Sequence, residues 1–290
     1  MVVAQAKKSL TEQLAQGGVE AASFEAWELV GAVLGKVRPS ALAALHAHPV
    51  SQTQWSHLKL LASRRTAGEP LQYILGEWDF YGRTFQCRPG TFIPRPETEL
   101  LVDTALEFFR KNGYVSTENN RAARVLDLCC GSGCVGLTLA LEGGCLATLI
   151  DISPDAIALT QENAKRLGVH TADFLLADVL TSYERLGSYD LIVCNPPYVR
   201  SDEMQDLPKE VAFEPCQALD GGEDGLVYYR ALTEHWLPNL AVGGALVVEH
   251  GAGQGSAVTD LFLKAKLSMV STKEDLSGID RVTRGLRVET

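Results

Sequence analysis

The chain lacks the surplus of lysine and arginine found in proteins that bind nucleic-acid phosphates nonspecifically. Its 290 residues hold 26 Lys and Arg against 36 Asp and Glu, a formal net charge of −10. Because nonspecific phosphate binding depends on excess positive charge, we expect no direct nucleic-acid binding. The sequence also has no apolar run of about 18 residues, the length that a membrane-spanning helix needs. We therefore expect no membrane association.

We also expect neither a framework of paired cysteines nor an apolar leader. Residues 1–8 (MVVAQAKK) have no long apolar segment after their positive charges, which does not fit a signal peptide. The seven cysteines are odd in number and several lie in apolar context, a pattern that fits reduced thiols in a cytoplasmic protein. Three of them, Cys129, Cys130 and Cys134, cluster without a matching Cys or His pair at zinc spacing. We expect no metal site.

The first part of the chain has the spacing of short helices. Over residues 10–67 apolar side chains recur at helical intervals, without a strand pattern. Ser23 is a suitable N-cap for one of these helices, and another helical segment begins at Ser51. Residues 40–46 are expected to form a further helical turn. Since the chain is long enough for two domains, we predict a small all-α domain over residues 1–75.

A β-hairpin and an α/β domain are predicted to follow. Residues 78–87 (WDFYGRTFQC) alternate around Gly82, which predicts a hairpin, and we assign residues 76–95 to a linker built on it. Pro96 is well placed to begin a helix. In residues 96–290 strand and helix patterns alternate, which predicts a mostly parallel, doubly wound α/β sheet with an antiparallel edge.

A glycine-containing turn follows the first predicted strand of the α/β domain. It carries Gly131 and Gly133, which would let the backbone approach a ligand closely and adopt positive φ. A turn of this kind also fits a dinucleotide fold, although Cys129 stands where a dinucleotide fingerprint has its first glycine. The turn by itself therefore indicates only a nucleotide-like ligand.

Acidic residues end the next two predicted strands. Asp151, about 20 residues beyond the turn, can accept hydrogen bonds from both hydroxyls of a ribose. Asp178 can accept from an exocyclic adenine amine, and Val179 can contact the ring. The alternative for each aspartate is helix capping or ordinary loop polarity. Their position at successive strand ends favours a binding role.

The tetrapeptide Asn195-Pro196-Pro197-Tyr198 directly follows the apolar run at residues 189–194. Two consecutive prolines make a stiff turn, which leaves the carbonyls of Asn195 and Pro196 outside any helix and available to a ligand. An Asn side chain offers both a donor and an acceptor, and an aromatic ring follows it. We expect this site to hold a planar –NH2 group; the alternative is a proline-rich turn with no such role.

These motifs resemble class I S-adenosylmethionine-dependent methyltransferases, a Rossmann-like fold, over about residues 90–290. Asp127-x-Cys129-x-Gly131-Ser132-Gly133 is similar to the first motif of that class, with Cys129 in place of a glycine. A main-chain contact at Cys129 would survive this change if the backbone there does not need positive φ. The resemblance implies that Asp127 lies near the methionine amino group and Asp151 holds the ribose. The implied cofactor-binding residues are Thr98, Asp127, Cys129, Cys130, Gly131, Ser132, Gly133, Asp151, Asp178, Val179 and Asn195.

The order of motifs is similar to that of the PrmC/HemK family, protein-(glutamine-N5) methyltransferases that act on peptide chain release factors. The matching segments are residues 92–99 (FIPRPETE), 195–199 (NPPYV), 213–215, 218–222, 224–226, 229–230, 249–251 and 278–282. The resemblance implies methylation of the glutamine in a Gly-Gly-Gln sequence, with S-adenosyl-L-homocysteine as the second product. It also implies that the N-terminal domain helps to bind the protein substrate. We further expect a cytoplasmic monomer.

The chemistry of an amide acceptor suggests roles for the tetrapeptide. The amide nitrogen is a poor nucleophile, so nitrogen, methyl carbon and sulfur must be held in line. The Asn195 side-chain oxygen and the Pro196 carbonyl would accept the two amide hydrogens, and Tyr198 would pack on the amide plane. Asn195, Pro196 and Tyr198 are thus the predicted catalytic residues, and residues 195–198 the predicted acceptor site. Glu249 and His250 are expected to be structural, and Arg95 to orient the helix or the substrate.

Three other functions remain open from the sequence. A glutamine methyltransferase could act on a ribosomal protein instead. An adenine-N6 DNA methyltransferase uses the same tetrapeptide on a base flipped out of the duplex, but the acidic charge of this chain speaks against it. A noncatalytic scaffold of the same fold is disfavoured because Asn195, Asp151 and both loop glycines are present.

Overall fold

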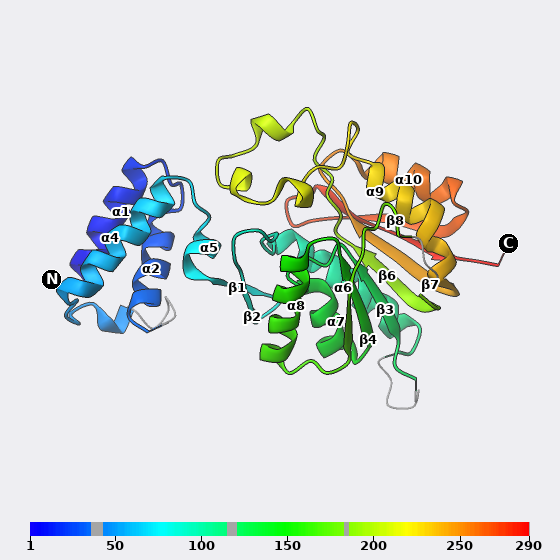
Figure 1. The fold of residues 1–290 in the computed structure, drawn as a ribbon, viewed down its shortest axis with the longest axis horizontal. Helices are drawn as coiled ribbons and strands as arrows, with labels where there is room; N and C mark the ends of the chain where they lie inside the picture. Colours follow the sequence, from blue (N-terminus) through cyan, green and yellow to red (C-terminus); the bar gives the residue numbers. More distant parts are fainter. Residues whose placement is uncertain (36–42, 115–120, 183–185, 290) are drawn as a thin grey trace. The chain divides into compact units, whose positions relative to one another are not determined.

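The computed structural model describes residues 1–35, 43–114, 121–182 and 186–289 (Figure 1). The chain divides into two compact units. The first comprises residues 1–78, 87–89 and 208–213, and the second comprises the remainder. The predicted domain boundaries after residues 75 and 95 remain predictions.

The first unit is built from helices. They are α1 (Val3–Gln16), α2 (Ala22–Val33), α4 (Gln52–Thr66) and α5 (Leu71–Leu75), with a 3-10 turn at Ala43–Leu45. Their apolar faces share one core, in which Leu10, Leu14, Leu29 and Leu58 are fully buried. The prediction of helices without strands in this region is confirmed for the described residues. Of the turn expected at residues 40–46, positions 40–42 lie outside them.

The two predicted helix starts have different outcomes. The segment expected to begin at Ser51 is confirmed as α4. The Ser51 side chain caps this helix: it accepts the backbone N–H of Gln54, whose own side chain accepts the N–H of Ser51. The cap at Ser23 is wrong, because α2 already begins at Ala22. The Ser23 hydroxyl accepts a hydrogen bond from the Lys7 ammonium at 2.6 Å instead.

A segment from much later in the chain, residues 208–213, belongs to the first unit. Arg65 pairs with the buried Glu25 and also with Glu210 of this segment, at 2.7 Å. Gly68, at the end of α4, lies against Lys209 and Phe213. These contacts attach part of the loop that follows the Asn-Pro-Pro-Tyr segment to the helical unit.

The predicted β-hairpin is confirmed. Strands β1 (Glu77–Phe80) and β2 (Arg83–Gln86) pair in a two-stranded sheet. The two turn residues between them, Tyr81 and Gly82, both have positive φ, at 50° and 72°. Two left-handed residues give a tight turn whose twist matches that of the flanking strands.

The second unit contains a seven-stranded sheet, as the alternating strand and helix patterns predict. Along the sheet the strand order is β5-β4-β3-β6-β7-β9-β8. The first five strands are parallel, and β9 is antiparallel to both of its neighbours, which confirms the antiparallel edge. The bounds are β3 Arg124–Leu128, β4 Leu146–Asp151, β5 Ala172–Leu176, β6 Tyr189–Cys194, β7 Leu240–Glu249, β8 Leu267–Glu274 and β9 Asp280–Arg287.

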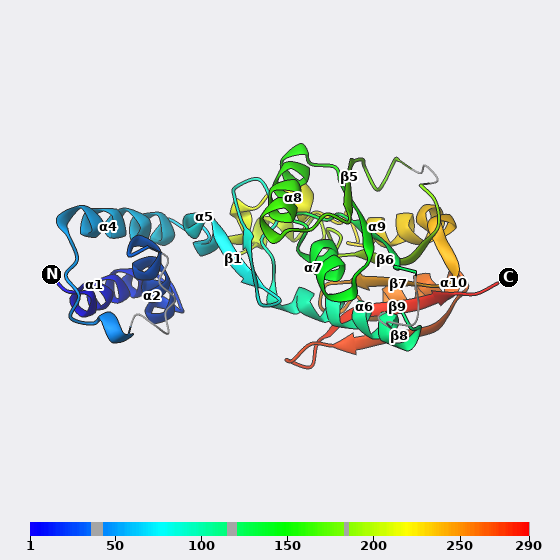
Figure 2. The ribbon, with the colours of Figure 1, turned by 90° about the horizontal axis from the view of Figure 1, so that it is seen from below.

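Helices cover both faces of this sheet (Figures 1 and 2). On one face Val125 and Val193 share a core with α6 (Glu99–Lys111), α7 (Cys134–Gly143) and α8 (Pro154–Leu167), which follow one another across the sheet. On the other, Leu126 and Ile192 share a core with α9 (Val227–Ala231), a π turn at Leu232–Trp236 and α10 (Gly255–Lys264). Successive residues of a strand thus pack into cores on opposite faces of the sheet, as a doubly wound sheet requires. Short 3-10 turns lie at Pro96–Thr98, Met204–Asp206, Val211–Phe213, Cys216–Ala218 and Leu237–Asn239.

Candidate active site

The parallel strands bring the predicted site residues to one edge of the sheet. Leu128 at the end of β3 pairs with Ile150 on one side and Cys194 on the other, and Cys194 pairs with Val248 of β7. The residues that follow these positions therefore lie beside one another. The chain also reverses its strand order at β3, where sheets of this kind bind ligands.

The turn after β3 is left-handed at three positions. Its φ values are 59° at Cys129, 57° at Gly131 and 79° at Gly133. The backbone does therefore need positive φ at Cys129, where a side chain costs roughly 1–2 kcal/mol. The Cys129 thiol lies near that of Cys194, which together with burial raises the pKa of Cys129. The Cys130 N–H donates to the Ile150 carbonyl at 2.9 Å and holds the backbone of the turn against β4.

Glycines allow close approach around this turn. A Cβ on Gly133 would lie 2.7 Å from the Thr160 side chain, and one on Gly136 would lie 2.7 Å from the Asp127 carboxylate. A Cβ on Gly131 would meet nothing nearer than Phe92, at 3.8 Å. Gly133 and Gly136 are thus required by packing, whereas Gly131 leaves space for a ligand beside the backbone.

Asp127 is a buried carboxylate at the start of the turn. It is 2% exposed, and one of its oxygens accepts the backbone N–H of Gly136 at 2.8 Å. Burial raises the pKa of Asp127 to about 7, and the negative charge of Asp151 adds to this, while the Gly136 N–H opposes it. A carboxylate in this environment is stabilised by a bound cation such as an ammonium group.

Asp151 is oriented by the same turn. Its two oxygens accept the backbone N–H groups of Gly131 at 2.8 Å and Ser153 at 2.9 Å. Burial raises the pKa of this carboxyl. Each carboxylate oxygen has a further lone pair, so Asp151 can accept ribose hydroxyls while the backbone holds it in place.

Asp178 and Val179 serve local structure. The Asp178 carboxylate accepts the Leu180 N–H and the Thr181 hydroxyl, at 2.8 and 2.9 Å, and so caps the turn that follows β5. Val179 is 3% exposed, and its carbonyl accepts the Trp236 indole N–H. The capping alternative for Asp178 is thus realised. Contacts of these residues with an adenine remain predictions.

Two glycines pack closely against the backbone of the Asn-Pro-Pro-Tyr segment. A Cβ on Gly221 would lie 2.9 Å from the Pro197 carbonyl, and one on Gly225 would lie 2.5 Å from the Tyr198 carbonyl. The Tyr198 carbonyl also accepts the Gln254 side-chain amide at 2.9 Å. Among the described residues no donor reaches the Pro196 carbonyl. It therefore remains available to a ligand.

The two side chains of this segment have distinct surroundings. The Asn195 amide donates to the hydroxyl of Thr98, which begins α6, at 3.1 Å. The Tyr198 ring lies against Gly251, and burial raises the pKa of its phenol to about 12, which keeps it neutral at physiological pH. The structure thus brings Thr98 beside Asn195 from a position 97 residues earlier in the sequence.

Arg95 connects two segments of the protein near the site. Its guanidinium pairs with the buried Glu214 and lies over the Phe92 ring, 5.1 Å from the ring centre. The other Glu214 oxygen accepts the Ile93 N–H at 2.9 Å. Arg95 therefore ties the segment before α6 to the loop after β6, as the first of its two expected roles requires.

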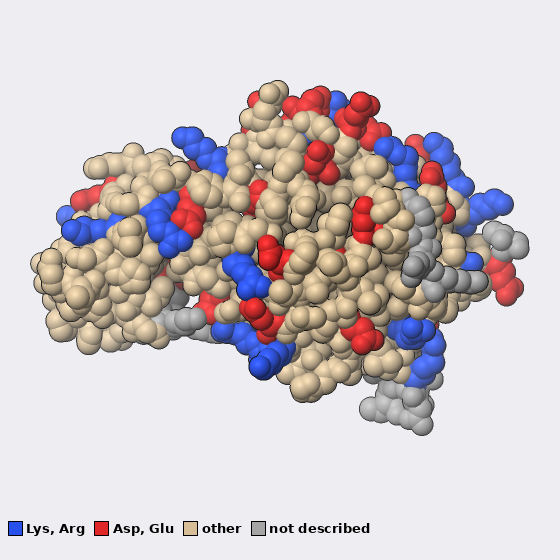
Figure 3. All heavy atoms as spheres, in the orientation of Figure 1, with Lys and Arg blue, Asp and Glu red and all other residues tan. Residues whose placement is uncertain are grey.

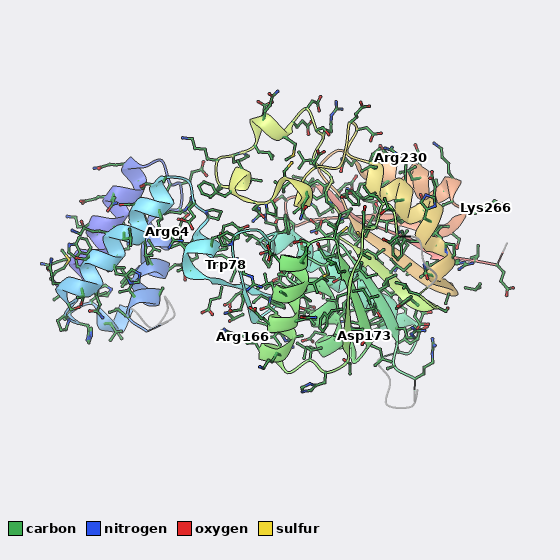
Figure 4. All side chains as sticks on the ribbon, viewed as in Figure 1. Arg64, Trp78, Arg166, Asp173, Arg230 and Lys266 are labelled. Atoms are coloured by element: carbon green, nitrogen blue, oxygen red, sulfur yellow. The ribbon has the colours of Figure 1, made fainter. Side chains whose placement is uncertain are left out.

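Sequence analysis missed Tyr228. This half-buried tyrosine lies close enough to Cys129 and Asp178 for their charges to raise its pKa, in addition to burial. Sequence analysis named the adjacent Tyr229 and Arg230 instead. Tyr229 is fully buried and donates to the Glu249 carbonyl, and Arg230 pairs with Asp224 on the surface (Figure 4). The adjacent tyrosines offered no signal for which of them faces the site.

The described residues contain neither a cluster of metal ligands nor a membrane-spanning helix. No three His, Cys, Asp or Glu side chains there are grouped so that they could hold a metal ion. No helix in these ranges is long and apolar enough to span a membrane.

Comparison with known proteins identifies the class of this fold. Residues 102–253 match the family model described as the methyltransferase small domain, and residues 5–76 match the PrmC N-terminal domain. Among solved structures, a methyltransferase from Pyrococcus furiosus has a TM-score of 0.52 at 13% identity, covering 72% of this chain and 91% of that one. The fold and the site define a class I S-adenosylmethionine-dependent methyltransferase.

The curated relatives identify the family. A release factor glutamine methyltransferase of Vibrio cholerae is 37% identical over 281 residues, which cover 97% of this chain and 95% of the relative. One of Geobacter sulfurreducens is 38% identical over 276 residues, covering 94% and 92%. The chain belongs to the family of release factor glutamine methyltransferases. Its cofactor is S-adenosylmethionine, and the carboxylates of Asp127 and Asp151 beside an open glycine turn fit that group.

Proposed function

We propose that this enzyme methylates the N5 nitrogen of a glutamine in a peptide chain release factor. The observation that carries the proposal is the pair of acceptors at residues 195–196. The Pro196 carbonyl has no donor among the described residues, and the Asn195 NH2 is directed to Thr98, which leaves the Asn195 oxygen for a ligand. Two acceptors on a stiff turn suit the two hydrogens of a primary amide.

Each residue has a stated part in the reaction. The cofactor supplies an electrophilic methyl group. The Asn195 oxygen and the Pro196 carbonyl hold the acceptor amide and stabilise the positive charge that develops on its nitrogen. Tyr198 covers the amide plane and excludes water. Asp127 holds an ammonium group and Asp151 two ribose hydroxyls. The remaining predicted cofactor contacts are made by Thr98, Cys129, Cys130, Gly131, Ser132, Gly133, Asp178, Val179 and Asn195.

The family names and the surface charge both bear on the acceptor. The relatives from Vibrio cholerae and Geobacter sulfurreducens are named for release factors. In the face shown in Figure 3, acidic side chains gather over the loop that follows β6, where Asp202 and Glu203 are exposed. Such a surface disfavours the phosphate backbone of a DNA duplex. It supports a protein acceptor over the adenine alternative.

We further propose the organisation of the whole enzyme. Residues 1–75 form a helical domain that helps to bind the protein substrate, residues 76–95 a linker, and residues 96–290 the catalytic domain. The enzyme works as a cytoplasmic monomer.

Parallel acceptor assays test the proposal. Purified release factor, ribosomal proteins and duplex DNA are each incubated with S-adenosylmethionine that carries a labelled methyl group. We expect label on the release factor alone. Label on a ribosomal protein or on adenine would assign the enzyme to that alternative, and cofactor binding with no label on any of the three acceptors would contradict the proposed acceptor.

A further inference from the structure

A buried carboxylate that the reaction does not use lies beside the catalytic tetrapeptide. Glu249 ends β7, and because Cys194 pairs with Val248, it lies next to Asn195 at the ends of adjacent strands. It is 1% exposed, and its Oε2 has no hydrogen-bond partner among the described residues. Burial raises the pKa of this carboxyl to about 7. Burying an incompletely paired carboxylate is costly, and such groups are most common at functional sites.

The backbone of Glu249 is fixed. Its carbonyl accepts the hydroxyl of the fully buried Tyr229 at 3.0 Å, and on its other side it pairs with Val282 of β9. These contacts hold the backbone of Glu249 in place. Its position relative to Asn195 is set by the sheet.

A hydrogen bond joins the catalytic amide to a buried neighbour of this carboxylate. The Asn195 NH2 donates to the hydroxyl of Thr98, which is also 1% exposed. Thr98 and Asn195 both lie near enough to Glu249 to lower the pKa of its carboxyl, against the larger effect of burial. Above that pKa the ionised carboxylate only accepts hydrogen bonds, so it can face the NH2 end of the Asn195 amide and not its oxygen end.

We propose that Glu249 is a positioning residue, which acts with Thr98 to fix the Asn195 amide so that its oxygen faces the acceptor amide. The inference rests on the proposed function of Asn195. If the Asn195 amide were reversed, its NH2 group would meet the NH2 group of the acceptor. Two donors would then face each other, and the acceptor hydrogen bond would be lost. Glu249 and Thr98 exclude that orientation without touching the substrate.

Substitutions at Glu249 and Thr98 test the inference. In Glu249→Gln the new side chain has the same shape but can present its own NH2 to Thr98 and Asn195. In Thr98→Val the hydroxyl is replaced by a methyl group. We expect each to lower kcat on the acceptor protein at least about tenfold, somewhat less than direct loss of a positioned polar group. The Kd for S-adenosylmethionine, measured by calorimetry, should stay within about twofold in Glu249→Gln, because Glu249 is not among the residues expected to contact the cofactor.

Two matched variants separate positioning from folding. Thr98→Ser keeps a hydroxyl and should restore most of the activity that Thr98→Val loses. Thr104→Val removes an equally buried hydroxyl on α6, the helix that directly follows Thr98. Among the described residues this hydroxyl bonds the Leu100 carbonyl alone, and the variant should leave the rate unchanged. If Glu249→Gln fails to fold, the Thr98 pair carries the test. Equal losses in Thr98→Val and Thr98→Ser would overturn the inference.

A double-mutant cycle supplies the decisive readout. If Glu249 acts through Asn195, Glu249→Gln should add no further loss once Asn195→Ala is present, whereas independent effects would multiply. Multiplied losses would overturn the inference. A large loss in Asn195→Ala with none in Glu249→Gln would also overturn it and leave the proposed function intact. Normal activity in Asn195→Ala would instead refute the role of Asn195 itself, and this inference with it.

Discussion

The carboxylate of Asp151 accepts the backbone N–H of Gly131, 20 residues earlier in the chain, at 2.8 Å. This bond joins the end of β4 to the glycine turn after β3. The residue proposed to hold the ribose and the turn proposed to border the cofactor are therefore set in place together. Disturbing either should affect cofactor binding before it affects the acceptor.

Replacement of Asp151 should weaken cofactor binding. Asp151→Ala removes a charged acceptor both from the Gly131 N–H and from the ribose hydroxyls. Hydrogen bonds to charged groups contribute about 1.5–3 kcal/mol, so the Kd for S-adenosylmethionine should rise roughly 10- to 150-fold. Calorimetric titration measures this directly. An unchanged Kd would remove Asp151 from the cofactor site.

Asn195→Ala should separate chemistry from cofactor binding. The variant loses one acceptor for the substrate amide and keeps the glycine turn. Loss of one positioned polar group lowers kcat about 100-fold or more, while calorimetry should show cofactor affinity close to that of the wild type. Near-normal methyl transfer would exclude Asn195 from the mechanism.

Tyr198→Ala should affect the acceptor more than the cofactor. The ring lies against Gly251 and its phenol stays neutral, since its pKa is raised to about 12. We expect KM for the acceptor protein to rise, while Tyr198→Phe, which keeps the ring, serves as the matched control. Steady-state kinetics with each substrate varied in turn measures the two effects. Weaker cofactor binding with an unchanged acceptor KM would place the ring in the cofactor site instead.

The stability of the cofactor-free enzyme should depend on pH through Asp127. Burial raises its pKa from the ordinary value of 3.8 to about 7, so between these values the folded state keeps a proton that the unfolded chain has released. The stabilisation is complete below about pH 4 and is lost as the pH rises through 7. Glu249, whose pKa is also raised to about 7, contributes in the same direction.

Asp127→Asn isolates this contribution. The asparagine does not titrate and can still accept the Gly136 N–H. Relative to the wild type, the variant should gain a few kcal/mol in free energy of unfolding between pH 5 and pH 8, on about 1.4 kcal/mol per pKa unit as an upper bound. Urea denaturation at the two pH values gives the difference. A difference that does not change with pH would show that Asp127 titrates normally.

The left-handed conformation of Cys129 predicts an ordering among its substitutions. With φ at 59°, a β-branched side chain is strained and a glycine is not. Cys129→Gly should keep the free energy of unfolding within about 1 kcal/mol of the wild type, because relief of strain offsets the entropy of glycine. Cys129→Val should lower it by about 2 kcal/mol or more. Thermal unfolding compares the two, and equal stabilities would contradict the strained conformation.

Much of this account could be predicted from local sequence signals. The alternation of strands and helices predicted the doubly wound sheet, and the helical spacing of apolar residues after Ser51 predicted the helix α4. Such signals work because each depends on neighbours within a few residues. The cap predicted at Ser23 is wrong because the partner of its hydroxyl is Lys7, 16 residues away, which a signal from near neighbours does not include.

The parts that could not be predicted depend on tertiary contacts. The positive φ of Cys129 follows from the turn geometry between β3 and α7. The link between Thr98 and Asn195 spans 97 residues. The placement of residues 208–213 in the helical unit depends on the pairing of Arg65 with Glu210. None of these three features follows from a periodic pattern in the sequence.

Mass mapping of the methylated product tests the central claim most directly. Purified release factor is incubated with the enzyme and S-adenosylmethionine, digested, and each peptide is fragmented to locate the added mass. The account predicts the mass of one CH2 group on a single glutamine, the one in the Gly-Gly-Gln sequence, and its absence with Asn195→Ala. A methyl group on any other residue, or none on a release factor exposed to cofactor-bound enzyme, would contradict it.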